Sequence, residues 1–154
     1  MEIGGKNTDF ECGVNLGGAN VKKVGTGEMK FAGSSMGKLE ISAGKMCFSA
    51  STALPTSISF PGGALTADGE VYIDPSAKIT GNTAAIVFDS DYLATWETSL
   101  TDSNEGGLTK RGTGVLTLAA VPNYKGTTMV EAGTLLFAAG STIEELPVAI
   151  GMAF

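Results

Sequence analysis

Apolar and polar residues alternate along this chain in short runs with a period of two. In the run 28–31, Met29 and Phe31 share one face, and in the run 38–41, Leu39 and Ile41 do the same. The alternation recurs in the runs 45–48, 57–60, 70–73, 115–118 and 134–137. Each run is bounded by Gly, Pro, Asn, Asp or Ser, and this length and period are typical of β-strands. The pattern therefore predicts an all-β chain built from many short strands.

One strand–turn–strand segment occurs twice, at residues 21–48 and again at residues 106–137. Each copy contains Lys-x-Gly-x-Gly between two alternating runs and Ala-Gly before the last run. The shared positions are Lys23, Gly25, Gly27, Ala43 and Gly44 in the first copy and Lys110, Gly112, Gly114, Ala132 and Gly133 in the second. Glycine at these points indicates tight turns, because it adopts positive φ without steric cost. A strand and turn repeated along a chain is typical of a solenoid.

The repeat favours one fold among those that use short, evenly spaced strands. Such strands fit a sandwich, a barrel or a parallel β-helix. A β-helix coil takes roughly 20–25 residues, so the two copies lie about four coils apart. We therefore predict a single parallel β-helix domain over residues 1–154, with a β-sandwich or jelly roll as the alternative.

Two parts of the chain break the regular pattern. Residues 74–105 are less regular and are expected to form an excursion from the solenoid or a coil with a long turn. Within them, residues 91–100 place Leu93, Trp96 and Leu100 at helical spacing and predict two turns of helix. Residues 141–146 predict another single turn, with Ser141 as its N-cap.

Composition and charge exclude several classes of function. The chain has 154 residues, 22 of them glycine, and is 43% hydrophobic, which is too apolar for disorder and too rich in glycine for a helical protein. Its net charge of −6 lacks the basic footprint that nucleic-acid binding needs. There is no histidine, so no Ser-His-Asp triad can form within the chain, and no cofactor motif is present. Cys12 and Cys47 form no CxxC, and whether they are bonded is left open.

No targeting or membrane-spanning segment is evident in the sequence. No stretch approaches 18 apolar residues, so no transmembrane helix is expected. The N-terminal residues lack the basic and apolar regions of a signal peptide. We therefore expect either a cytosolic protein or a piece of a longer exported one.

Four residues are candidates for ligand contact: Asp89, Asp91, Asp102 and Trp96. The carboxylates lie close together in sequence, but their spacing matches no EF-hand, and solvated loop residues are the simpler interpretation. Asp89 and Asp91 are also the candidate acid pair of a polysaccharide-cleaving enzyme. Trp96 either packs in the core or stacks on a sugar.

Residues 106–137 resemble a known repeat. They run as Gly-Leu-Thr-Lys, Gly-x-Gly, a short strand, then a Tyr-x-Gly-x-Thr turn at Tyr124 and Gly126, and finally Ala-Gly-Thr-Leu. This sequence resembles the autotransporter-associated β-strand repeat, also called the passenger-associated transport repeat. The copy at 21–48 keeps the lysine and the glycines but lacks the tyrosine turn. The two copies together cover about half of the chain.

The resemblance implies a right-handed parallel β-helix from the exported passenger of a Gram-negative surface protein. It implies a secreted or cell-surface location and a structural stalk, without catalysis, that assists passenger folding and export. The expected partners are the rest of a longer passenger or copies of this chain stacked end to end. The alternatives are an adhesin-type module that binds glycan or host protein through residues 89–105 and, less favoured, a polysaccharide-cleaving enzyme.

Overall fold

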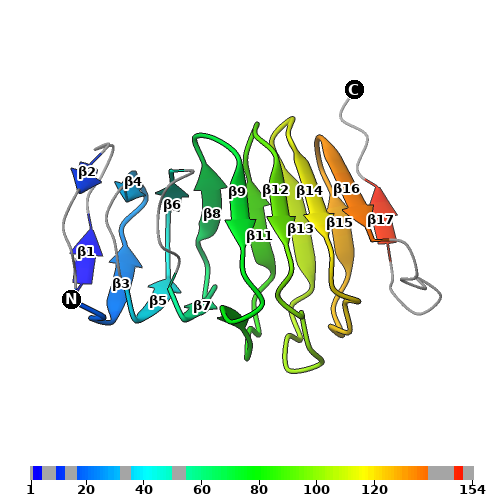
Figure 1. Cartoon of the computed structure of the whole chain (residues 1–154), viewed down its shortest axis with the longest axis horizontal. Coiled ribbons are helices and arrows are strands. Elements are labelled where there is room, and N and C mark those ends of the chain that lie inside the picture. The colour runs from blue at the N-terminus through cyan, green and yellow to red at the C-terminus, as the bar shows by residue number, and fades with distance from the viewer. Residues whose placement is uncertain are drawn as a thin grey trace.

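The chain forms a parallel β-solenoid whose turns stack along the long axis of the molecule (Figure 1). The computed structural model describes residues 2–4, 10–12, 17–31, 36–49, 55–138 and 148–150. Every strand pairing in these residues is parallel, which excludes the antiparallel sandwich and confirms the predicted β-helix. The right-handed winding stays a prediction. The described residues contain no helix long and apolar enough to cross a membrane.

The strands lie in three sheets, here called sheets A, B and C. Sheet A contains β1 (Glu2–Gly4), β3 (Val21–Val24), β5 (Lys38–Ile41), β7 (Ser57–Ser59) and β10 (Lys78–Ile79). Sheet B contains β2 (Phe10–Cys12), β4 (Glu28–Phe31), β6 (Lys45–Phe48), β8 (Ala64–Ala67), β11 (Ile86–Asp89), β13 (Leu108–Arg111), β15 (Thr128–Val130) and β17 (Val148–Ile150). Sheet C contains β9 (Val71–Ile73), β12 (Ala94–Trp96), β14 (Val115–Leu118) and β16 (Thr134–Phe137).

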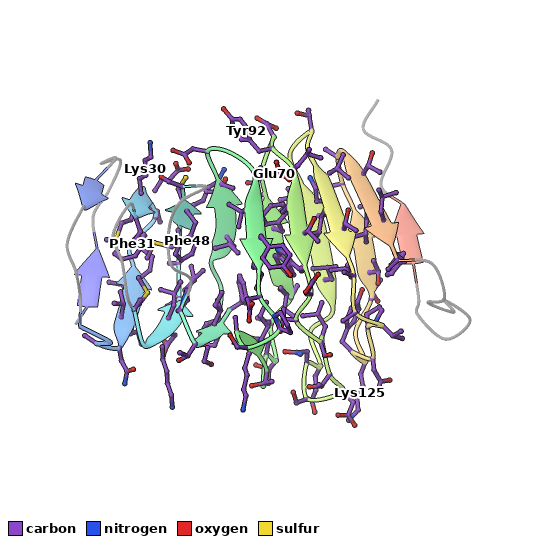
Figure 2. The ribbon with its side chains drawn as sticks, in the orientation of Figure 1. Lys30, Phe31, Phe48, Glu70, Tyr92 and Lys125 are labelled. Atoms are coloured by element: carbon purple, nitrogen blue, oxygen red, sulfur yellow. The ribbon has the colours of Figure 1, made fainter. Side chains whose placement is uncertain are left out.

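The two-residue alternation builds the core as columns of aligned side chains. Met29 is aligned with Met46, Met46 with Leu65, and Leu65 with Phe88, and all four are buried. Phe31 and Phe48 form a second column and meet edge to face with ring centroids 6.1 Å apart, between the strands in Figure 2. Each turn therefore buries its apolar face against the turns before and after it, as solenoids require.

The two ends of the solenoid are built differently. Sheet A runs through the N-terminal turns and ends at β10, whereas sheet C begins at β9 and runs through the C-terminal turns. Only sheet B extends along the whole molecule. The turns also differ in length. Glu28 is aligned with Lys45, 17 residues later (45 − 28), whereas Ile86 is aligned with Leu108, 22 residues later (108 − 86). The longer turns have room for the additional strand of sheet C.

The predicted helix over residues 91–100 is wrong. Residues 94–96 form strand β12, which is hydrogen bonded to β9 on one side and β14 on the other. Ala94 and Trp96 point inward while Leu93 is exposed, so the period is two and not 3.6. Pairing with two neighbouring strands overrides the weak helical spacing. The second predicted helix, at residues 141–146, lies outside the described residues.

Residues 74–105 are part of the stacked turns and not an excursion from them. They contain β10, β11 and β12, each in register with a strand of the preceding turn. The irregularity seen in the sequence comes from the connections between these strands.

The positions of the strands show that Cys12 and Cys47 do not form a disulfide. Cys47 is a free, buried thiol. Cys12 lies in β2, which is separated from the β6 strand of Cys47 by β4, so the two backbones are about 9.6 Å apart, beyond the reach of a disulfide.

Candidate functional site: two buried lysine corners

The first copy of the repeat forms a corner closed by a buried lysine. Lys23 follows Val21 by two residues in β3, so its side chain points inward, in register with Ile41 of the next turn. Its Nζ donates hydrogen bonds to the carbonyl oxygens of Val24 (3.0 Å), Gly25 (2.9 Å) and Ala43 (3.2 Å). The first two acceptors belong to the corner itself and the third to the following turn. The lysine thus closes the connection from β3 to β4 and links it to the next turn.

The second copy forms the same kind of corner around Lys110. This residue lies in β13, is 0% exposed and continues the interior column that contains Phe88. Its Nζ donates to the carbonyl oxygens of Ser90 (3.3 Å), Gly112 (2.7 Å) and Arg111, and lies 5.8 Å from the centroid of the Phe88 ring. Three carbonyl acceptors match the three N–H donors of an ammonium group. The aromatic face adds a favourable cation–π contact.

A glycine of the next turn covers each carbonyl ring. Gly44 covers the first corner and Gly133 the second, with φ of 66° and 73°. A Cβ on Gly44 would lie 2.3 Å from the Gly27 carbonyl oxygen, and one on Gly133 would lie 2.4 Å from the oxygens of both Gly112 and Gly114. No side chain fits there, and both backbones have left-handed φ. The glycines of the repeat are therefore required by close packing between successive turns.

The two corners occupy different places in the solenoid. The Lys23 corner connects sheet A to sheet B, whereas the Lys110 corner connects sheet B to sheet C. Lys23 reaches forward to Ala43 of the following turn, and Lys110 reaches back to Ser90 of the preceding one. The repeat therefore encodes a corner between two strands and not a position in a particular sheet.

Burial sets the electrostatics of both lysines. It lowers the pKa of Lys23 and of Lys110, because the low-polarity interior disfavours the ammonium form. For Lys110 the nearby carboxylates of Asp89 and Asp91 act in the opposite direction and raise the pKa. The Nζ atoms face main-chain carbonyls and are closed off from solvent, so these lysines hold the backbone and do not present a nucleophile.

The tyrosine turn of the second copy also brings a glycine into close contact with a neighbouring turn. Tyr124 is buried, and its hydroxyl lies 2.6 Å from Oγ1 of Thr128. A Cβ on Gly126 would lie 2.2 Å from the backbone nitrogen of Gly107, whose φ is 79°. Tyr124 therefore braces its own turn through Thr128, and Gly126 allows close contact with the preceding turn.

A buried asparagine pair, which no motif in the sequence had indicated, lies at the connection that leads back into sheet B. Asn82 Nδ2 donates to Asn104 Oδ1 over 2.7 Å, and Asn104 Nδ2 donates to the Ile79 carbonyl over 2.8 Å. Asn82 Oδ1 in turn accepts from the Phe60 backbone N–H at 2.6 Å. The two asparagines are separated by the same interval as Ile86 and Leu108, which are aligned one turn apart. Two asparagines spaced by the length of one turn are therefore the sequence signal that could have indicated this pair.

The four candidate ligand contacts do not form one site. Asp89 is ion-paired with Lys45 at 2.8 Å, and Asp91 accepts hydrogen bonds from the backbone nitrogen (2.7 Å) and Oγ1 (2.9 Å) of Thr113. The Thr113 bonds lower the pKa of Asp91. Each carboxylate thus connects one turn to another. Asp102 is exposed in the connection after Leu100.

Trp96 lies in the core and is 0% exposed, so its ring is not available to stack on a sugar. It meets Phe88 edge to face, with ring centroids 5.4 Å apart. Among the described residues there is no group of three or more His, Cys, Asp or Glu placed to hold a metal ion.

Comparison with known proteins identifies one part of the chain. Residues 108–137 match the family model described as Passenger-associated-transport-repeat. This segment spans β13 to β16 and contains the Lys110 corner, the tyrosine turn and the covering glycine Gly133. No curated protein matches the chain, and no solved structure matches it.

Proposed function

We propose that this chain is a structural segment of the passenger of an autotransporter-like protein, exported to the surface of a Gram-negative bacterium or released from it. The observation that carries the proposal is the match of residues 108–137 to the passenger-associated transport repeat. The role is that of a stalk without catalysis, which holds other parts of a longer passenger away from the membrane. Its partners are neighbouring turns of that passenger or a second copy stacked on its end.

The lysine corners give this role a physical mechanism. A strand added to the solenoid finds the unpaired backbone groups of the last turn, and its apolar side chains extend the interior columns. The corner then closes when the lysine reaches carbonyl oxygens of two turns and a glycine covers them. Folding can therefore proceed turn by turn as the chain emerges from the membrane.

A surface-display assay tests the proposal. The chain, carrying an epitope, is inserted between the signal peptide and the outer-membrane barrel of a model autotransporter, and display is measured by antibody binding to intact cells. We expect display to be retained with the intact chain and to fall when residues 108–137 are deleted or when Gly133→Ala is introduced.

The matched control is Gly81→Ala, which changes a glycine of similar φ that has no neighbouring atoms within 4 Å of the added Cβ. Display that is unaffected by deletion of residues 108–137 would contradict the proposed role.

A further inference from the structure

A shallow hollow of about 250 Å³ lies on the outward face of sheet A, over strands β3, β5 and β7. Its polar lining consists of Asn20, Lys22, Lys38, Glu40, Ser57 and Ser59. None of these residues belongs to the lysine corners. The Lys22–Glu40 ion pair and the bond from the Lys38 N–H to Asn20 Oδ1 each join two turns, but the hollow itself is open surface. It is a surface feature that the proposed structural role leaves unexplained.

The hollow exists because side chains of different length are aligned on neighbouring strands. Strand register places Glu40 beside Ser59 and Lys38 beside Ser57. On the far side of Ser57 lies Lys78 of β10. Neighbouring strands are about 4.8 Å apart, so the two serines form a low floor next to the long side chains of β5.

The lining offers both hydrogen-bond donors and acceptors. Lys22 Nζ lies 2.9 Å from Oε1 of Glu40, and the Ser42 hydroxyl donates to the same oxygen over 2.7 Å. The Ser42 hydroxyl and the Lys22 ammonium lower the pKa of Glu40 and keep it ionised, while its Oε2 is left to accept another bond. Within the described part of the chain, Lys38 takes part in none of the ion pairs, and the hydroxyls of Ser57 and Ser59 take part in none of the side-chain hydrogen bonds.

The chemistry of this lining selects one class of ligand. A carboxylate oxygen and two serine hydroxyls suit a molecule rich in hydroxyl groups, which donate and accept at once. Lys22 is ion-paired with Glu40, whereas Lys38 is not ion-paired among the described residues, which suits a ligand that places a negative charge at Lys38. We propose that the hollow on sheet A binds a hexuronate unit of an acidic polysaccharide, with its carboxylate at Lys38 and its hydroxyls at Ser57, Ser59 and Glu40.

The binding proposal does not depend on the passenger role, so it can be wrong while the passenger role remains correct. The probe is a dimer of galacturonic acid, titrated into the intact chain and followed by calorimetry and by chemical shifts of the sheet A amides. Because the hollow is open and its lining contains no aromatic ring, we expect saturable binding with a Kd of about 1–10 mM, a binding free energy of about −4 to −3 kcal/mol. Raising the salt concentration to 0.5 M should weaken it, since exposed charges are screened.

Two variants and one control locate the binding. Lys38→Gln should raise the Kd about fivefold, the upper range for one exposed ion pair. Ser59→Leu should abolish saturation because it removes a hydroxyl and fills the floor. Thr117→Leu makes a similar change on the outward face of sheet C and should leave the Kd unchanged.

Two further titrations separate the chemistry of the ligand. Sodium acetate supplies the carboxylate without the sugar, and maltose supplies hydroxyls without the charge. We expect neither to saturate in the millimolar range. The proposal is overturned if the galacturonate dimer does not saturate, if acetate or maltose binds equally well, or if Ser59→Leu binds like the unmodified chain.

Discussion

A lysine at an inward position of a strand is the residue-scale feature that distinguishes this solenoid. Period-two alternation directs Lys23 and Lys110 into columns otherwise filled by Ile41 or by Phe88. A buried ammonium is costly unless its donors are satisfied. Here each ammonium donates to three carbonyl oxygens, and these hydrogen bonds offset the cost of burying the charge while they close the corner.

Replacing the lysine of the second corner should destabilise the protein. In Lys110→Met the carbonyl oxygens of Ser90, Arg111 and Gly112 lose their charged donor, so we expect the free energy of unfolding to fall by about 1–3 kcal/mol. Urea denaturation measures the change. Lys78→Met, at an exposed position of β10, is the control and should stay within about 0.5 kcal/mol of the unmodified chain. An unchanged stability in Lys110→Met would show that apolar packing replaces the ammonium without loss.

Two glycines with nearly the same φ separate backbone strain from crowding. Gly81→Ala adds a Cβ at φ 72° in open space and should cost about 1 kcal/mol. Gly133→Ala adds one at φ 73° that lies 2.4 Å from two carbonyl oxygens, and should cost about 1–3 kcal/mol more. Thermal and urea unfolding compare the pair. Equal losses would mean that the corner relaxes to admit the methyl group.

The buried thiol makes stability depend on alkaline pH. Burial, with smaller effects of Glu28 and Asp68, raises the pKa of Cys47 from 9.0 to about 12. The unfolded chain therefore releases the thiol proton from about pH 9 upward while the folded chain keeps it, so stability is complete below pH 9 and is lost between pH 9 and 12. Between pH 7.5 and pH 10 the unmodified chain should lose about 1 kcal/mol more than Cys47→Ala. A parallel pH dependence of the two proteins would refute this assignment.

At the scale of single elements, the sequence reveals most where the period-two pattern is clean. The runs 28–31, 38–41, 45–48, 115–118 and 134–137 correspond to β4, β5, β6, β14 and β16 with the expected bounds. The pattern failed at β12, where Leu93, Trp96 and Leu100 happen to fall at helical spacing. Which of these side chains point inward depends on β9 and β14, which pair with β12 from other turns of the chain.

The candidate site was predicted only in part, and for a similar reason. The repeat drew attention to the correct lysines and glycines, because a duplicated local motif is visible in one sequence. That the first copy joins sheet A to sheet B while the second joins sheet B to sheet C is not visible, since it depends on how many strands each intervening turn contains. The partners of Asp89 and Asp91 lie in other turns and were hidden for the same reason.

The asparagine pair is an element-scale device that can be tested directly. Asn104→Ala removes bonds to Asn82 and to the carbonyl oxygen of Ile79 inside the molecule, so we expect a loss of about 2–3 kcal/mol in unfolding free energy. Asn123→Ala changes an exposed asparagine of the next turn and should have little effect. Similar urea midpoints for both variants would show that the pair does not hold the turns together.

At the scale of the whole molecule, each strand of the described residues pairs only with strands of the turns directly before and after it, and this makes damage local. Lys110→Met should speed amide exchange in β11, β13 and β15, which adjoin the second corner, and leave β3 to β6 protected. Lys23→Met should instead speed exchange in β3 to β6 and leave β11, β13 and β15 protected. Hydrogen exchange followed by mass spectrometry distinguishes this from uniform acceleration, which would indicate that the entire solenoid unfolds as one unit.

The alignment of each strand with the strand one turn away also governs how such a protein can change in length during evolution. Removing the segment between equivalent points of β4 and β6 would set Met46 where Met29 stood and leave every inward residue facing inward. Removing a segment one residue longer would turn the following strand inside out. Descendants of this chain are therefore expected to differ in length by complete turns, so that natural variation in the reach of the molecule comes in discrete steps.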